Sequence, residues 1–210
     1  MSLPREVVED VRAAAGGKGN RAVELLERAV AALESGRMVE AVRFATESKG
    51  LAARSGAIRE VLGLALYRRG RFREALRELQ AYRRITGRLD QNHLIADSHR
   101  ALDAPEKAVT AAREALDTRA HLPAEARAEA AVVAGAALAD LGRYEEALTL
   151  LRRFQRGSEG ASPSDLRVWY VMGDILERSG RRRDAARAFR RILDHDANSF
   201  DAAERLARLT

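Results

Sequence analysis

The chain has 210 residues with a formal net charge of +6, no cysteine, 46% hydrophobic residues and only 5% aromatic residues. The lack of cysteine excludes a disulfide framework, a thiolate metal site and a cysteine nucleophile, and it favours a reducing compartment such as the cytoplasm. The first twenty residues lack the apolar core of a signal peptide, and no later run approaches the ~18 apolar residues of a membrane span. We therefore expect a cytoplasmic protein that does not enter the membrane.

Residues 1–20 predict an N-terminal helix followed by a flexible linker. The helix begins at Pro4, because proline is favoured in the first helical turn, and the linker is the sequence GGKGN at residues 16–20. This glycine-rich segment has neither the spacing nor the Ser or Thr of a phosphate-binding loop, and no strand precedes it. We expect no cofactor there.

A pattern of three residues recurs five times between residues 21 and 198: a small residue, a turn residue seven positions later, and an alanine five positions after that. The series reads Ala29, Gly36, Ala41; Gly63, Gly70, Ala75; Ala96, Asp103, Ala108; Gly135, Gly142, Ala147; Gly173, Gly180, Ala185. Glycine inside a helix costs ~1 kcal/mol relative to alanine, so the small residues mark points where two helices cross closely. The turn residues end the first helix in a left-handed backbone, which glycine adopts freely and aspartate tolerates.

The stretches that carry this pattern resemble the tetratricopeptide repeat family. The best matches are LGLALYRRGRFREAL at 62–76, AGAALADLGRYEEAL at 134–148 and WYVMGDILERSGRRRDAARAF at 169–189. The resemblance implies an all-α fold, a right-handed α-solenoid of about five helix–turn–helix repeats that bury their apolar sides against one another. The expected repeats cover about 22–55, 56–88, 89–122, 128–161 and 166–198, within a domain of residues 21–198. Longer loops are expected at 117–125 and 156–165.

Residues 199–210 predict a C-terminal capping helix. Phe200, Ala203, Leu206 and Leu209 follow one another at helical intervals, and Ser199 is the candidate N-cap.

The resemblance also implies a concave groove lined by the first helices, and hence a non-catalytic adaptor or scaffold that binds a protein or peptide segment. The groove residues expected from the family's spacing are Glu60, Leu64, Tyr67, Arg68, His93, Asp97, Arg100, Arg167, Tyr170, Asp174, Glu177 and Arg178. Mixed charges and tyrosines suit an extended peptide or a chain terminus. The alternative is that these side chains pair with one another across adjacent helices.

The first repeat differs, because Val23, Leu26, Val30 and Leu33 form an apolar stripe. Either the N-terminal helix folds back over this stripe, or a partner's apolar helix docks there. The chaperone-binding members of the family hold a terminal carboxylate with a lysine and an asparagine at the positions of Leu26 and Val30. We therefore do not expect that activity here.

No pattern predicts an enzyme or a metal site. The four histidines include no pair at the i, i+4 spacing of a helical metal site, and no nucleophile, base and orienting group converge in the sequence. A catalytic role is not expected.

Nucleic-acid binding is the main alternative function, because the chain carries two arginine-rich clusters that would suit RNA phosphates. The clusters are Arg68, Arg69, Arg71, Arg73, Arg83 and Arg84, and Arg181, Arg182, Arg183, Arg187, Arg190 and Arg191. Interleaved acidic residues and the scarcity of aromatic stacking platforms argue against it. A further alternative is self-assembly into a homo-oligomer through the first repeat or the end helix.

Overall fold

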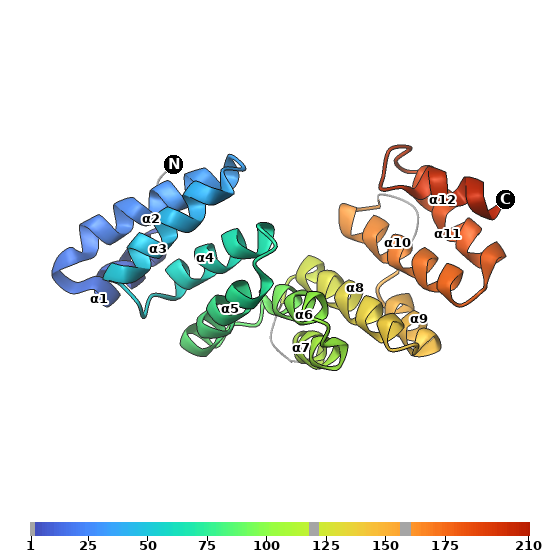
Figure 1. The fold of residues 1–210 in the computed structure, drawn as a ribbon, viewed down its shortest axis with the longest axis horizontal. Coiled ribbons are helices and arrows are strands. Elements are labelled where there is room, and N and C mark those ends of the chain that lie inside the picture. Colours follow the sequence, from blue (N-terminus) through green and yellow to red (C-terminus); the bar gives the residue numbers. More distant parts are fainter. Residues whose placement is uncertain (1–2, 118–121, 156–160) are drawn as a thin grey trace. The chain divides into compact units, whose positions relative to one another are not determined.

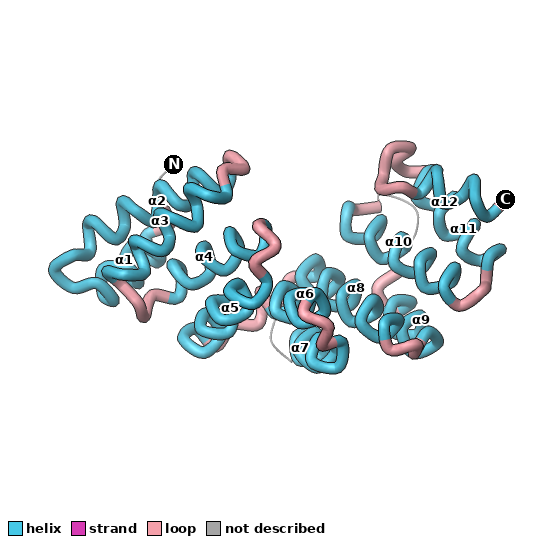
Figure 2. Tube along the Cα trace, in the orientation of Figure 1, coloured by secondary structure: helices cyan, strands magenta, loops and turns pink. Residues whose placement is uncertain are grey.

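The computed structural model of the chain describes residues 3–117, 122–155 and 161–210. Every regular element in these ranges is a helix, which confirms the predicted all-α fold (Figure 1 and Figure 2). The two predicted loops fall partly on residues 118–121 and 156–160, which lie outside the described residues.

The chain divides into two compact units, Met1–Leu102 and Asp103–Thr210. The first unit contains α1 (Arg5–Ala15), the 3₁₀ turn η1 (Gly16–Lys18), α2 (Gly19–Glu34), α3 (Met38–Leu51), α4 (Gly56–Arg68), α5 (Phe72–Thr86) and α6 (Asn92–Ala101). The second contains α7 (Pro105–Asp117), α8 (Ala124–Asp140), α9 (Tyr144–Arg152), α10 (Pro163–Arg178), α11 (Arg182–Leu193) and α12 (Ala202–Leu209). In the first unit α2 packs on α3 and α4 on α5, and in the second α8 packs on α9 and α10 on α11. These are four of the five helix pairs that the recurring pattern predicts.

Three of these pairs cross at a glycine of the first helix. An ideal Cβ atom at Gly63 would lie 2.7 Å from Leu79 Cδ2, and one at Gly173 would lie 2.8 Å from Phe189 Cε1. At Gly135 the nearest atom is Leu151 Cδ1, at 2.8 Å. Carbon atoms in van der Waals contact prefer ~3.5–4.0 Å. The structure therefore confirms that the second helix occupies the space of the missing side chain.

The predicted turn residues all lie in the left-handed region of the backbone. Their φ angles are 72° at Gly36, 69° at Gly70, 58° at Asp103, 72° at Gly142 and 79° at Gly180. After the Gly70 turn, the Arg71 amide donates to the Leu66 carbonyl at 3.0 Å, which satisfies a carbonyl at the end of the helix. The prediction is confirmed at all five turns, including the one without glycine.

The N-terminal helix α1 covers the Val23 and Leu26 part of the apolar stripe of α2, so the fold-back interpretation is confirmed there. Val11 is fully buried in one cluster with Val23 and Leu26. The Ser55 hydroxyl, at the N-cap of α4, donates to Asp10 Oδ2 at 2.5 Å. Apolar contact with α2 and a hydrogen bond at the start of α4 thus hold α1 in place.

The start of α12 differs from the prediction that Ser199 is its N-cap. The helix begins at Ala202, and the Ser199 hydroxyl donates to Asp196 Oδ2 at 2.6 Å. Phe200 follows with a φ of 56°. The prediction was wrong because a nearby carboxylate binds the serine hydroxyl, as short polar side chains commonly do in turns.

We expect Gly173→Ala to lower the melting temperature of the chain, because its methyl group would meet the Phe189 ring, and such overpacking costs about 1–3 kcal/mol. The control is Gly50→Ala in α3, where the added Cβ has no atom within 4 Å. The Gly50→Ala variant should be stabilised by up to ~1 kcal/mol, because alanine has a higher helix propensity than glycine. Equal shifts of the two variants by circular dichroism would contradict the crossing argument.

We expect Val11→Asp to detach α1, because a carboxylate without a hydrogen-bond partner costs at least ~1–3 kcal/mol when buried. The melting temperature falls, and a dye that binds apolar surface reports the uncovered Val23 and Leu26. Ala13→Asp, on the exposed side of the same helix, is the matched control. A Val11→Asp chain that behaves like this control would show that α1 does not cover the stripe in solution.

Candidate functional site

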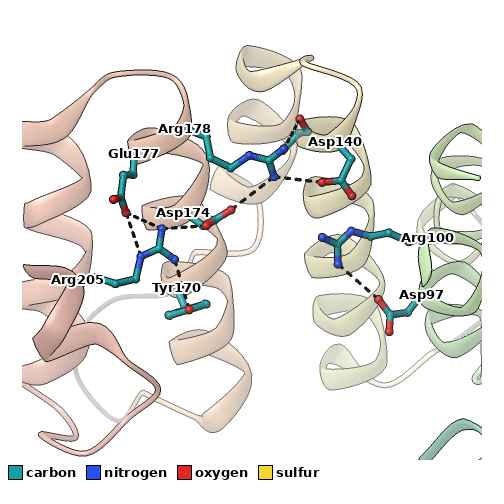
Figure 3. A network of polar contacts seen from close by, with 9 residues as sticks. Asp97, Arg100, Asp140, Tyr170, Asp174, Glu177, Arg178 and Arg205 are labelled. Carbon is teal, nitrogen blue, oxygen red and sulfur yellow. Dashed lines mark hydrogen bonds and ion pairs between the residues drawn. The ribbon is translucent and has the colours of Figure 1, made fainter. Parts of the chain in front are cut away.

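In the first unit, a hydrogen bond joins candidate groove residues of α4 and α6. The Tyr67 hydroxyl on α4 donates to Asp97 Oδ2 on α6 at 2.6 Å. Asp97 also lies 3.9 Å from the Arg100 guanidinium, one turn further along α6 (Figure 3). The Tyr67 ring packs edge-on against Phe72, with centroids 5.7 Å apart. The fold thus brings three predicted residues, Tyr67, Asp97 and Arg100, together.

A second contact lies at the beginning of the same two helices. Gln91 Nε2 donates to Glu60 Oε1 at 2.7 Å. Burial raises the pKa of Glu60 above its ordinary value, and the nearby charge of Asp90 adds to the shift. The His93 ring contacts the Asp90 carbonyl at 3.0 Å through Nδ1. Glu60 and His93 are therefore each held in place by a neighbouring polar group. We call the candidate groove residues of the first helices the row.

Leu64 and Arg68 of α4 lie toward the preceding helix α2. Leu64 packs against the cluster that contains Leu33, and Arg68 Nη1 donates to the Leu33 carbonyl at 3.3 Å. These two predicted groove residues thus join α4 to the end of α2.

In the second unit, ion pairs join the candidate residues of α10 to α8. Arg167 Nη1 lies 2.6 Å from Glu129 Oε1, and Arg178 Nη1 lies 3.2 Å from Asp140 Oδ1. Arg178 Nη2 also donates to the Ala139 carbonyl at 2.9 Å (Figure 3). The two arginines therefore hold opposite ends of α10 to α8.

On its other side, α10 is joined to α12 through Arg205. The Arg205 guanidinium donates to Glu177 Oε2 at 2.5 and 3.0 Å, to Asp174 Oδ1 at 2.9 Å and to the Tyr170 hydroxyl at 3.4 Å (Figure 3). The Tyr170 hydroxyl in turn donates to Asp201 Oδ1 at 2.8 Å. Three predicted groove residues of α10 thus surround one arginine of the end helix.

The charges of this cluster shift its pKa values. Burial alone would lower the pKa of Arg205, but the hydrogen bonds to Glu177, Tyr170 and Asp174 outweigh it and raise the pKa. Burial also raises the pKa of Tyr170, and its hydrogen bond to Asp201 adds to the shift. At neutral pH, Arg205 is therefore a full cation and Tyr170 a neutral donor.

Family spacing does not predict the residues that these groove positions contact on the next or preceding first helix. They are Gln91, Glu129, Asp140, Asp201 and Arg205. For α12 a signal was present, because Asp201 and Arg205 are four residues apart and so share one side of a helix. Only the apolar positions of that segment were interpreted.

The second unit also has a cavity of about 270 Å³ where the start of α8, the segment after α9 and the start of α10 meet. Its lining includes Arg127, Phe154 and Asp165. Asp165 is almost fully buried and accepts from the Ser162 amide and hydroxyl at 2.9 and 2.6 Å. These bonds cap α10, so we assign Asp165 a structural role.

Several arginines of the two basic clusters are engaged within the chain. Arg71 contacts Glu74 at 2.5 Å, and both Arg181 and Arg187 contact Asp184. These ion pairs reduce the positive charge available to a phosphate backbone.

Among the residues that the structure describes, no group of three or more His, Asp or Glu side chains could hold a metal ion. No helix in the same ranges is both long and apolar enough to span a bilayer.

The chain matches models of the tetratricopeptide repeat over residues 93–165 and 166–209. Among solved structures it is similar to YrrB, a TPR protein with an unusual peptide-binding site, with a TM-score of 0.63 and 17% identity over 94% of this chain and 97% of that one. It is also similar to a thermophilic TPR protein of Thermus thermophilus, with a TM-score of 0.68 and 16% identity over 89% of this chain and 97% of that one. For MamA protein the TM-score is 0.65, with 16% identity over 90% and 96%. No curated protein matches the chain.

The paired helices, the close crossings and the left-handed turns define an α-helical repeat protein. Together with the model matches, they place the chain in the tetratricopeptide repeat family.

The raised pKa of Glu60 predicts a pH-dependent effect of Glu60→Gln. A raised pKa means that the folded chain binds the proton more tightly than the unfolded chain, so this stabilisation is present below the unfolded pKa and is lost as the pH rises through the folded pKa. The glutamine side chain of the variant carries no such charge, and the variant should gain stability over wild type as the pH rises from about 4 to 7. Thermal melts across this range measure the difference.

Glu74→Gln is the control, because the pKa of Glu74 is shifted in the opposite direction to that of Glu60. Hydrogen bonds from Arg71 lower the pKa of Glu74, so removing this charge should not stabilise the chain at neutral pH. A Glu60→Gln variant that follows Glu74→Gln at every pH would contradict the burial of Glu60.

Proposed function

We propose that this chain is a non-catalytic cytoplasmic adaptor that binds an extended segment of a partner protein along the first helices of a right-handed superhelix. The observation that carries the proposal is the row of candidate groove residues, seen most completely on α10. Tyr170, Asp174, Glu177 and Arg178 follow one another on one side of this helix, carry both charge signs and all remain at least partly exposed. Such a row offers salt bridges and tyrosine contacts to a peptide backbone and its side chains.

Membership of the tetratricopeptide repeat family supports the broader statement, a scaffold for protein–protein interactions. The intrachain contacts of the row support the more specific statement, that the chain binds an extended segment of a partner protein. Because Tyr67 and Tyr170 are already oriented by Asp97 and Asp201, a ligand that contacts them loses little side-chain entropy. A micromolar affinity, ~8 kcal/mol, is the expectation for such a preformed surface.

The exposed ion pairs along the row, such as the one between Arg167 and Glu129, do not prevent binding. The Arg167 side chain remains 52% exposed in its pair with Glu129. Exposed pairs of this kind contribute only ~0–1 kcal/mol each. A charged residue of a ligand can therefore replace one partner at little cost, so the row can serve both the stacking of helices and recognition.

A display library of random peptides, screened on the full-length chain, tests the proposal. The double variant Tyr67→Phe with Arg100→Ala removes one hydroxyl and one charge from the row, and we expect peptides selected on wild type to bind it about tenfold more weakly, ~1.4 kcal/mol. Arg84→Ala, an exposed position on α5 outside the row, is the control and should bind like wild type.

The proposed placement of the groove would be contradicted if every selected peptide bound the double variant as tightly as wild type. It would also be contradicted if Arg84→Ala lost as much affinity as the double variant, because the ligand would then lie on the second helices.

A further inference from the structure

The Arg205 side chain is almost completely surrounded by other side chains. Only 11% of it is exposed, although it belongs to an end helix. It contacts the carboxylates of Asp174 and Glu177 and the Tyr170 hydroxyl (Figure 3). Its guanidinium carbon also lies 4.7 Å from the centre of the Phe189 ring. Two acids, a hydroxyl and an aromatic ring therefore converge on a single cation.

This arrangement suits a guanidinium better than an ammonium group. The planar guanidinium presents several N–H donors in fixed directions, so one group can bond Asp174 and Glu177 at once and still stack against a ring. A lysine would reach one carboxylate with a compact charge and would lose the stacking. The chemistry of the α10 face is thus selective for arginine.

The helix that supplies Arg205 is short and buries little apolar surface. It has 8 residues, and Ala202 is its one fully buried side chain. An isolated helix of that length is unstable in water. The segment before it carries Phe200 in the left-handed region, with a half-exposed ring that stacks on Tyr170 at 4.5 Å. Short elements that bury few apolar side chains open at a small free-energy cost.

We propose that the face of α10 formed by Tyr170, Asp174 and Glu177 is a binding site for an arginine on a helical segment of a partner protein, and that Arg205 occupies this site in the free chain. The inference rests on the proposed function and specifies the ligand chemistry at one part of the row. Asp201 and Arg205 define what such a segment must offer, an acceptor for the Tyr170 hydroxyl and an arginine one turn later.

In this arrangement α12 competes with the partner. Because α12 is tethered, it acts at a high effective concentration, and a partner binds only the fraction of chains in which the helix has opened. Removing the Arg205 side chain weakens the internal competitor and leaves the acidic site intact. Affinity for an external arginine segment should then rise.

The test uses the full-length chain and a labelled probe peptide with the sequence of residues 199–210, SFDAAERLARLT. By fluorescence anisotropy we expect Arg205→Ala to bind the probe at least about tenfold more tightly than wild type. Arg208→Ala, an exposed arginine of the same helix, is the matched control and should bind like wild type. A probe with lysine in place of its Arg205 should bind the Arg205→Ala chain about tenfold more weakly.

Equal affinity of wild type and Arg205→Ala for the probe would overturn the proposal, and so would equal affinity of the arginine and lysine probes. Concentration-dependent dimers of the wild-type chain that Arg205→Ala abolishes would also overturn it, because α12 would then be exchanged between two copies. The measurement does not depend on the random-peptide screen, so a failed screen and a failed probe are separate results.

Folding of Arg205→Ala is checked by its helical circular dichroism. If the variant is destabilised, methylguanidinium offers a second readout, because it should raise the melting temperature of Arg205→Ala more than methylammonium at the same concentration. The same salts should not differ on Arg208→Ala. Equal effects of both salts on Arg205→Ala would contradict a guanidinium site on α10.

Discussion

The close approach of two helices within each hairpin is the constraint on which the rest of this structure depends. At Gly63, Gly135 and Gly173 the second helix lies where a side chain of the first would be. This contact uses one side of the first helix. Its other side chains, including Tyr67 and Tyr170, are left to contact neighbouring first helices or a ligand.

Most of those remaining side chains are polar, and within each unit they join neighbouring first helices through hydrogen bonds and ion pairs. Tyr67 reaches Asp97 in the first unit, and Arg178 and Arg205 join α10 to α8 and α12 in the second. Apolar residues in this row would bind the neighbouring helices more firmly but would leave nothing to recognise a charged segment. The mixed charge of the row is therefore compatible both with the stacking of neighbouring helices and with the replacement of one ion-pair partner by a charged ligand.

The local features of the chain could be predicted from sequence, because they depend on residues close together. Asp103 takes the left-handed turn conformation at a position where the other turns have glycine. Ser199 is the counterexample, because a serine can cap a helix or bind a nearby carboxylate, and here its hydroxyl donates to Asp196. The candidate groove residues were placed only by family spacing, which assigns a side of a helix but not a contact.

The sequence by itself determined that the chain is helical, which positions must be small and where the chain reverses, because these follow from backbone conformation and short-range packing. Only the tertiary structure decided that α1 covers Val23 and Leu26, and that Arg205 reaches Asp174 across 31 positions of the chain. Such contacts depend on how one helix stacks against another. A charge on the surface of a helix is compatible with many neighbours, and the fold selects one of them.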